Sequence, residues 1–175
     1  AFAQDADALA KQLSNPIASL TSVPMQFNWD TGLGPDDDGG RVTLNVQPVI
    51  PMSIGEDWNL ISRTIVPIVN QWDVVPGQGD QFGLGDTVQS LFFSPKALTA
   101  GGWTWGVGPV FLLPTATDDF LGTEKWGAGP TAVALRQTAS GWSYGLLFNH
   151  IWSFAGSDDR QDVNATFLQP FVSKS

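Results

Sequence analysis

Three residues of this sequence are candidates for catalysis, and each lacks the partners that catalysis needs. His150 is the one histidine, so a Ser-His-Asp arrangement has a single option, and no nucleophile motif surrounds it. Asp118 and Asp119 are adjacent, so in an extended chain their carboxylates point in opposite directions. We find no catalytic constellation and predict that the protein is not an enzyme.

The acidic and glycine-rich stretches do not predict a metal or a cofactor. The run PDDDGG, residues 35–40, lacks the alternating acidic positions of an EF-hand, and consecutive aspartates usually form a solvated turn. The stretches GLGDT and GVGP are not followed by a helix, so they form no phosphate cradle. A chain without cysteine and with a lone histidine offers no metal site. Divalent-ion bridging between the acidic run and lipopolysaccharide is the less favoured alternative.

Composition excludes further classes of protein. The net charge is −9 with eight Lys and Arg, which argues against nucleic acid as a partner. Charged residues make up 14% of the chain, against roughly 25% in an ordinary soluble domain. No apolar run is long enough for a transmembrane helix, but a spanning β-barrel has none, because its apolar residues alternate with polar ones.

Such alternation is clearest in RVTLNVQPVIPMSI, residues 41–54. Val42, Leu44 and Val46 share one face of an extended chain, and polar residues share the other. The period of two predicts a strand with two different sides. The apolar side then lies against either a protein core or lipid.

Eight stretches alternate in this way and are predicted strands. They are residues 23–33, 41–54, 59–75, 82–97, 103–117, 126–137, 142–155 and 165–173. Most are long for a globular protein but suit a tilted crossing of a bilayer. Prolines inside these stretches should cause bulges or breaks at some sites, because proline donates no ladder hydrogen bond. These prolines are Pro48, Pro51, Pro67, Pro109, Pro114, Pro130 and Pro170.

The connections between these strands alternate strictly between long and short. The long ones, which hold most of the acidic residues, are 34–40, 76–81, 118–125 and 156–164, and the short ones are 55–58, 98–102 and 138–141. In an up-and-down meander alternate connections lie at the same end, and outer-membrane barrels have long outer loops and short periplasmic turns. We therefore predict an all-β fold: an antiparallel up-and-down transmembrane β-barrel of about eight strands.

Tryptophans mark both ends of the predicted strands. The set comprises Trp58, Trp103 and Trp142 beside the short turns, and Trp29, Trp72, Trp126 and Trp152 toward the long loops. Indole prefers the boundary between lipid and water, so two aromatic levels predict membrane interfaces. Trp103 and Trp105 share one face, where two indoles fit a lipid surface better than a small closed core. Large core residues at strand ends are the alternative.

If the apolar faces meet lipid, the polar faces line a lumen. The predicted lining residues are Gln26, Asn28, Thr43, Asn45, Gln47, Arg63, Asp86 and Asn149. Arg63 stands in the middle of a strand and should point inward, because its charge is costly in lipid. Asp86, on the next strand, is its expected counter-charge. A structural ion pair is favoured here over a selectivity element.

The N-terminal residues 1–20 are expected to differ from the barrel domain, residues 21–175. Ala1-Phe2-Ala3 fits the small-x-small pattern before a signal-peptidase cut, with an ordinary ragged terminus as the equal alternative. Residues 5–20 predict a short helix, because Leu9, Leu13, Ile17 and Leu20 share one face. This helix either packs on the domain or acts as a plug.

Eight segments together resemble a known family. In chain order they are LAKQLSNPIASL, SVPMQFNWD, LNVQPVIP, EDWNLISRTIVPI, GLGDTVQSLFFSP, GVGPVFLLPTATD, LGTEKWGAGPTAVAL and NHIWSFAG. They resemble the outer-membrane transporter family linked to the phenol meta-cleavage pathway, whose members are often mislabelled "neuromedin U". The resemblance implies a bacterial outer-membrane β-barrel with a channel or transport role.

The chain departs from that family at its C-terminal end. Family members continue beyond the equivalent of FLQPFVSKS, and outer-membrane barrels usually end on an aromatic residue, whereas the last residue here is Ser175. We therefore expect a truncated form. Either eight strands close a narrow barrel, or a larger barrel cut at this point has two open edges.

The expected function is passive uptake of small solutes across the bacterial outer membrane. The suggestion of aromatic or hydrophobic solutes comes from the resemblance alone, and the acidic loops should bias access against anions. The expected partners are outer-membrane lipid, lipopolysaccharide and a small-molecule solute. Two alternatives stay open: a structural barrel without a pore, and a soluble β-barrel that holds an apolar ligand and turns Val42 and Leu44 inward.

Overall fold

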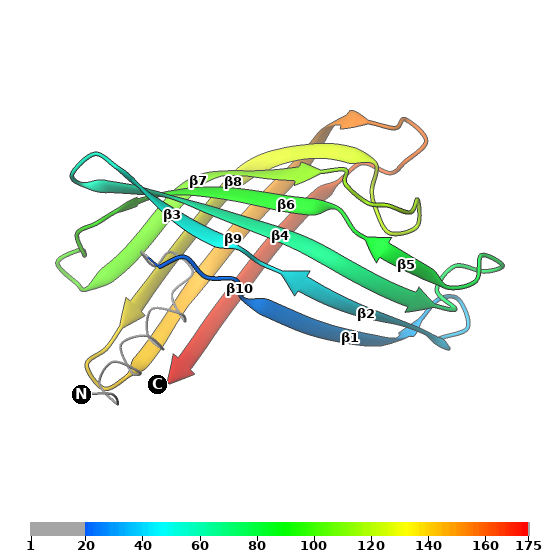
Figure 1. The fold of residues 1–175 in the computed structure, drawn as a ribbon, viewed down its shortest axis with the longest axis horizontal. Coiled ribbons are helices and arrows are strands. Elements are labelled where there is room, and N and C mark those ends of the chain that lie inside the picture. The colour runs from blue at the N-terminus through cyan, green and yellow to red at the C-terminus, as the bar shows by residue number, and fades with distance from the viewer. Residues whose placement is uncertain (1–19, 175) are drawn as a thin grey trace.

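The computed structural model describes residues 20–174, which form one antiparallel sheet (Figure 1). The strands are β1 (Met25–Leu33), β2 (Gly39–Val46), β3 (Val49–Ile54), β4 (Trp58–Trp72), β5 (Gln81–Leu84), β6 (Thr87–Pro95), β7 (Trp103–Leu113), β8 (Lys125–Gln137), β9 (Trp142–Gly156) and β10 (Asn164–Lys174). The predicted signal-peptide remnant and almost all of the predicted N-terminal helix lie outside the described residues. In the described part, no helix is long and apolar enough to cross a membrane.

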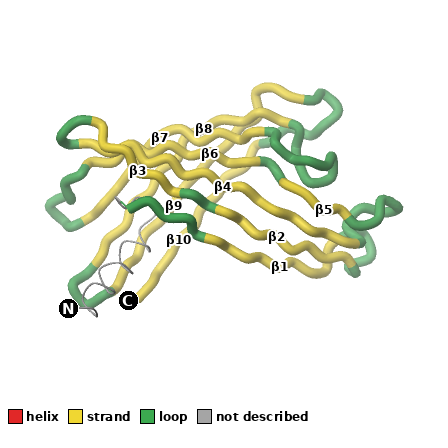
Figure 2. The backbone as a smooth tube through the Cα atoms, in the orientation of Figure 1, coloured by secondary structure: helices red, strands yellow, loops and turns green. Residues whose placement is uncertain are grey.

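The predicted all-β meander is confirmed. The strand order is β1-β2-β4-β6-β7-β8-β9-β10, and β3 and β5 each pair with β4. Two predicted strands are thus interrupted, one at Gln47–Pro48 between β2 and β3, the other at Gly85–Asp86 between β5 and β6. The short turns lie at one end of the strands and the long loops at the other, as Figure 1 and the loop segments of Figure 2 show.

Prolines interrupt the ladders at several predicted sites. Pro48 lies in the break between β2 and β3, and Pro114 directly follows β7. Pro109 of β7 and Pro130 of β8 pair with each other. On their other sides, Pro109 has no partner in the β6–β7 ladder and Pro130 has none in the β8–β9 ladder. The absence of a proline N–H explains these interruptions. The other prolines stay within paired strands: Pro51, Pro67 and Pro170.

The sheet curls into a half-barrel with two edge strands, β1 and β10, at the ends of the strand order. Side chains from both edges, including Gln26 of β1 and Gln169 of β10, line one cavity, so the two edges face the same interior. In residues 20–174 the sheet is therefore curled but open.

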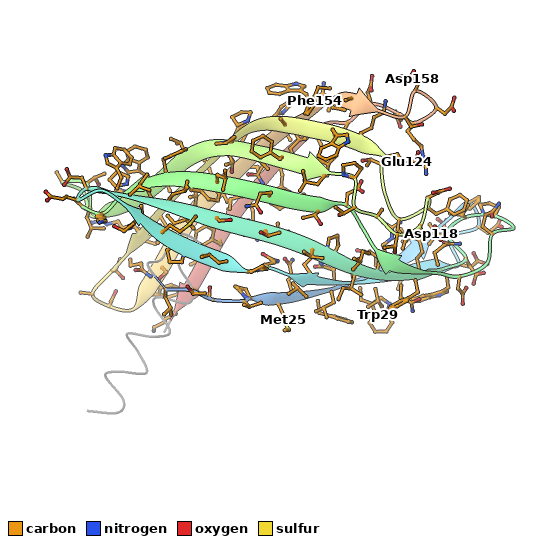
Figure 3. All side chains as sticks on the ribbon, turned by 45° about the horizontal axis from the view of Figure 1, so that its top comes forward. Met25, Trp29, Asp118, Glu124, Phe154 and Asp158 are labelled. Carbon is orange, nitrogen blue, oxygen red and sulfur yellow. The ribbon has the colours of Figure 1, made fainter. Side chains whose placement is uncertain are left out.

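The convex outer face of the sheet is largely apolar, with one hydrogen-bonded group of polar side chains around Gln89. On β1, Met25, Phe27 and Trp29 are 70%, 64% and 68% exposed, and Figure 3 shows Met25 and Trp29 pointing away from the sheet. On β9, Trp152 and Phe154 are also exposed. A soluble monomer rarely exposes so large a continuous apolar surface.

Aromatic side chains pack together on this outer face near the short turns. Trp58 meets Trp105 edge to face, with ring centroids 6.0 Å apart, and Trp103 meets Tyr144 in the same way at 5.8 Å. The Lys174 ammonium lies 5.4 Å from the centroid of the Trp142 ring. Trp103 and Trp105 share this face, as the alternation predicts.

The concave inner face is not polar throughout, which corrects the prediction of a polar lumen. Toward the short turns it holds a buried apolar cluster, which we call the core cluster: Val49, Ile61, Phe92, Val133, Leu135 and Leu147, with Phe171 packed against it. The prediction erred because it followed the polar residues of each strand. On the inner face of β9, the buried apolar residue Leu147 lies between the buried polar residues Ser143 and Asn149. One strand face therefore carries both apolar and polar side chains.

Candidate functional site

Six of the eight predicted lining residues surround one cavity in the middle of the inner face. This central cavity has a volume of about 430 Å³. The six residues are Gln26, Asn28, Asn45, Gln47, Arg63 and Asn149. They come from strands β1, β2, β4 and β9 and from the β2–β3 break, and the period of two on each strand turns them inward.

A line of side-chain hydrogen bonds follows the wall of the central cavity from β4 to β1. Arg63 Nη2 donates to Gln47 Oε1 at 2.6 Å, Gln47 Nε2 donates to Gln26 Oε1 at 3.0 Å, and Gln26 Nε2 donates to Asn28 Oδ1 at 3.1 Å. A guanidinium can only donate, so the first bond fixes the direction of those that follow. On the opposite side, the Thr131 hydroxyl lies within hydrogen-bond distance of both Asn149 Oδ1 and the Phe148 carbonyl oxygen.

The other two predicted lining residues, Thr43 and Asp86, lie in a second cavity toward the long loops. This loop-side cavity has a volume of about 380 Å³ and also contains Arg41. Phe120 and Leu121, from the loop between β7 and β8, line it as well. The loop between β7 and β8 therefore folds inward over this end of the half-barrel.

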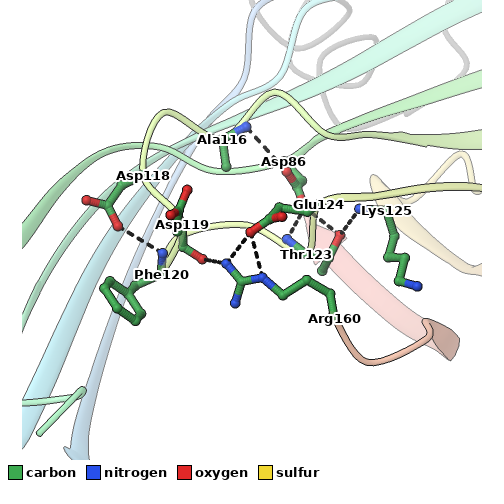
Figure 4. A network of polar contacts seen from close by, with 9 residues as sticks. All are labelled: Asp86, Ala116, Asp118, Asp119, Phe120, Thr123, Glu124, Lys125 and Arg160. Atoms are coloured by element: carbon green, nitrogen blue, oxygen red, sulfur yellow. Dashed lines mark hydrogen bonds and ion pairs between the residues drawn. The ribbon is translucent and has the colours of Figure 1, made fainter. Parts of the chain in front are cut away.

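Asp86 anchors that loop, as Figure 4 shows. Its Oδ1 accepts a hydrogen bond from the Ala116 amide at 3.3 Å, and its Oδ2 accepts from Thr123 N at 2.6 Å and Thr123 Oγ1 at 2.7 Å. The predicted Arg63–Asp86 pair is wrong, because β6 places Ser90 opposite Arg63. Asp86 instead lies in the break before β6, where the loop supplies its donors.

Two ion pairs tie the loop between β9 and β10 to this network. Arg160 lies 2.5 Å from Glu124 Oε1 and donates to the Asp119 carbonyl, and the buried Lys125 ammonium lies 3.0 Å from Asp162 Oδ1. Hydrogen bonds from Lys125 and then Ser153 lower the pKa of the Asp162 carboxyl. The Lys125–Asp162 link is therefore fully present above the ordinary aspartate pKa and is lost as the pH falls through the lowered value.

Replacing the loop anchor should loosen the loop between β7 and β8. In Asp86→Ala the three hydrogen bonds to Ala116 and Thr123 are lost, and each bond to a charged group contributes about 1.5–3 kcal/mol. We expect hydrogen exchange at the Thr123 amide to become at least about tenfold faster. Asp80→Ala, at an exposed position in another long loop, is the matched control. Unchanged exchange at Thr123 would contradict the anchoring role.

Some interior residues were missed by sequence reasoning. In the central cavity these are Ile65, Val88, Ile151, Ala165, Phe167 and Gln169. The period of two could have found them, since Ile65, for example, lies two residues after Arg63. Phe120 and Leu121 could not have been found in this way, because no local pattern predicts that an acidic loop folds inward.

The central cavity is lined by groups that can hold a ligand through hydrogen bonds and apolar contacts. Its lining supplies amide groups, one guanidinium and apolar side chains, rather than a nucleophile beside a base. Among residues 20–174, no group of three or more His, Cys, Asp or Glu side chains is placed to hold a metal ion.

Comparison with known proteins identifies the family. Neither the curated proteins nor the solved structures include a match to the chain. A sequence model of the family described as "Putative MetA-pathway of phenol degradation" matches residues 30–172. That range runs from β1 to β10 and includes the lining residues of both cavities except Gln26 and Asn28. The chain belongs to this phenol-degradation family.

Proposed function

We propose that the protein is a β-barrel of the bacterial outer membrane that takes up small solutes passively through its interior. The observation that carries the proposal is the orientation of β2. Thr43 and Asn45 line the two cavities, so Val42 and Leu44, which alternate with them, belong to the outer face. A soluble barrel with an apolar ligand inside requires the opposite orientation.

Membrane lipid and lipopolysaccharide are the proposed partners of the outer face. Exposed apolar side chains cover the strands, and tryptophans stand at both ends, including Trp58 and Trp142 near the short turns and Trp29 and Trp152 nearer the long loops. This distribution suits a hydrocarbon layer between two aqueous interfaces. The acidic loops would then face the cell exterior, as long loops do in outer-membrane barrels.

The solute would approach from the long-loop end. It would pass the loop-side cavity, where Phe120 and Leu121 narrow the interior, and reach the central cavity. The core cluster lies beyond the central cavity, toward the short turns. That cluster favours a second candidate function, a structural barrel without an open pore, because dry apolar packing excludes water and ions.

Single cysteines on β2 test the membrane orientation. The chain has no cysteine of its own, so the background is clean. In protein inserted in vesicles, we expect Thr43→Cys and Asn45→Cys to react with a water-soluble maleimide, and we expect Val42→Cys and Leu44→Cys to be quenched by a lipid-bound probe. A protein that stays soluble without detergent and shows no lipid quenching would exclude the barrel.

Transport itself is tested by conductance in planar bilayers and by solute flux into vesicles. Lipid quenching together with measurable flux supports the uptake proposal. Lipid quenching without conductance or flux selects the structural barrel instead.

A further inference from the structure

The central cavity holds a positive charge without a carboxylate beside it. Among the lining residues Arg63 is the one charged side chain, and it donates to the neutral amide of Gln47. The ion pairs within residues 20–174 are Lys125–Asp162 and Arg160–Glu124, both at the long loops. A charge removed from water is normally paired, so the cavity is electrostatically incomplete.

The hydrogen bonds around Arg63 direct further donors into the cavity. Because each amide oxygen in the line from Gln47 to Asn28 accepts a bond, the line ends with the NH₂ group of Asn28. Arg63 and the NH₂ group of Asn28 therefore offer N–H donors to a ligand that supplies acceptors.

The rest of the lining is mostly apolar, with the amides of Asn45 and Gln169 beside it. Ile65, Val88, Ile151 and Phe167 face the same space as Arg63. The volume of about 430 Å³ lies in the usual range for small-molecule sites. A ligand that matches both parts has a compact apolar body and a negatively charged head.

We infer that the central cavity is a binding site for small apolar carboxylates, with Arg63 holding the carboxylate. The planar guanidinium suits this role, because it can donate two parallel hydrogen bonds to one carboxylate. The inference rests on the proposed uptake function and names its class of solute. It also reverses the charge preference expected from the loops, since the acidic residues lie at the rim and the binding charge inside is positive.

The test is a comparison of benzoate with benzyl alcohol, which has a similar ring but no charge. Dissociation constants are measured by ligand-observed NMR on the full chain in uncharged detergent at physiological ionic strength, which screens the acidic loops. Benzoate should bind at least about tenfold more tightly than benzyl alcohol, as a charge-assisted hydrogen bond implies. Equal affinities would overturn the inference.

Arg63→Gln removes the charge and keeps a polar side chain. It should weaken benzoate binding by about tenfold or more and leave benzyl alcohol binding unchanged, which also shows that the variant is folded. The benzoate affinity of Arg63→Lys should lie between those of the unchanged protein and Arg63→Gln, because an ammonium lacks the planar fork of a guanidinium. The matched control is Arg136→Gln, which removes an exposed charge elsewhere on the sheet and should alter neither constant. Benzoate binding that is insensitive to Arg63→Gln would refute the site.

Failure of this inference and failure of the uptake proposal are distinguishable. Conductance or flux without selective benzoate binding leaves the uptake function standing and removes the carboxylate site. Arg63-dependent benzoate binding without conductance or flux supports the site and removes the transport role.

Discussion

Phe92→Ala is expected to destabilise the protein by about 3–5 kcal/mol, the usual loss for a large aromatic residue deleted from a packed interior. The Phe92 side chain is 0% exposed and belongs to the core cluster with Ile61 and Leu135. Its removal loses the transfer free energy of the ring and leaves a cavity between strands that cannot close freely. The free energy of unfolding is measured by urea titration of protein folded in lipid vesicles.

Phe93 is a matched control on the same strand. It is the next residue of β6, points to the outer face and is 42% exposed. Phe93→Ala leaves no closed cavity, so the loss should be limited to the transfer term, about 1–2 kcal/mol. Equal losses for the two variants would mean that the inner face near the short turns is not a dry core, and the argument for a structural barrel would lose its main support.

Leu146→Arg should destabilise the membrane-inserted protein by about 2 kcal/mol. Leu146 lies on the outer face of β9 and is 42% exposed. An arginine on the lipid face costs about 2–4 kcal/mol at the bilayer midplane and less toward the interfaces. Leu146 lies four residues along the strand from Trp142, between the proposed interface and the midplane. The measurement is the same urea titration in vesicles.

Leu146→Arg also distinguishes a surface that contacts lipid from a surface that contacts water. On a water-exposed surface an apolar-to-charged change usually alters stability by no more than about 0.5 kcal/mol. Gln78→Arg, in the exposed loop between β4 and β5, is the control and should be neutral in both cases. A neutral Leu146→Arg would contradict the proposal that this face contacts lipid.

Together these variants test the two faces of one sheet. Adjacent residues such as Phe92 and Phe93 differ in surroundings because successive side chains of a strand point to opposite sides. The function proposed for the protein depends on that difference, since the outer side must suit lipid and the inner side must suit a solute.

Strand positions and side-chain faces were predictable because both are local properties. The period of two in residues 41–54 placed Thr43, Asn45 and Gln47 on the inner face, and the structure finds them there even though the strand breaks at Pro48. The same rule placed Arg63 and Asn149 inside. Alternation of long and short connections predicted the meander, because each hairpin is formed by neighbours in the chain.

Partners across the interior were not predictable from the same information. Arg63 lies on β4, where the register sets it opposite Ser90, and Asp86 lies directly before β6, where it accepts from the Ala116 and Thr123 amides. The strand register depends on the positions of the strand breaks and on the packing of an irregular loop. Neither of these produces a periodic pattern in the sequence.

The sequence by itself determined the antiparallel meander, the apolar outer face and the residues that line the interior, because alternation along a strand decides the side to which each residue points. Only the tertiary structure decided how the interior is divided into a core cluster, a central cavity and a loop-side cavity. That division arises where residues from distant strands come to one level of the curled sheet. Arg63 thereby lies among amides and apolar side chains, and Asp86 anchors a loop instead of pairing with Arg63.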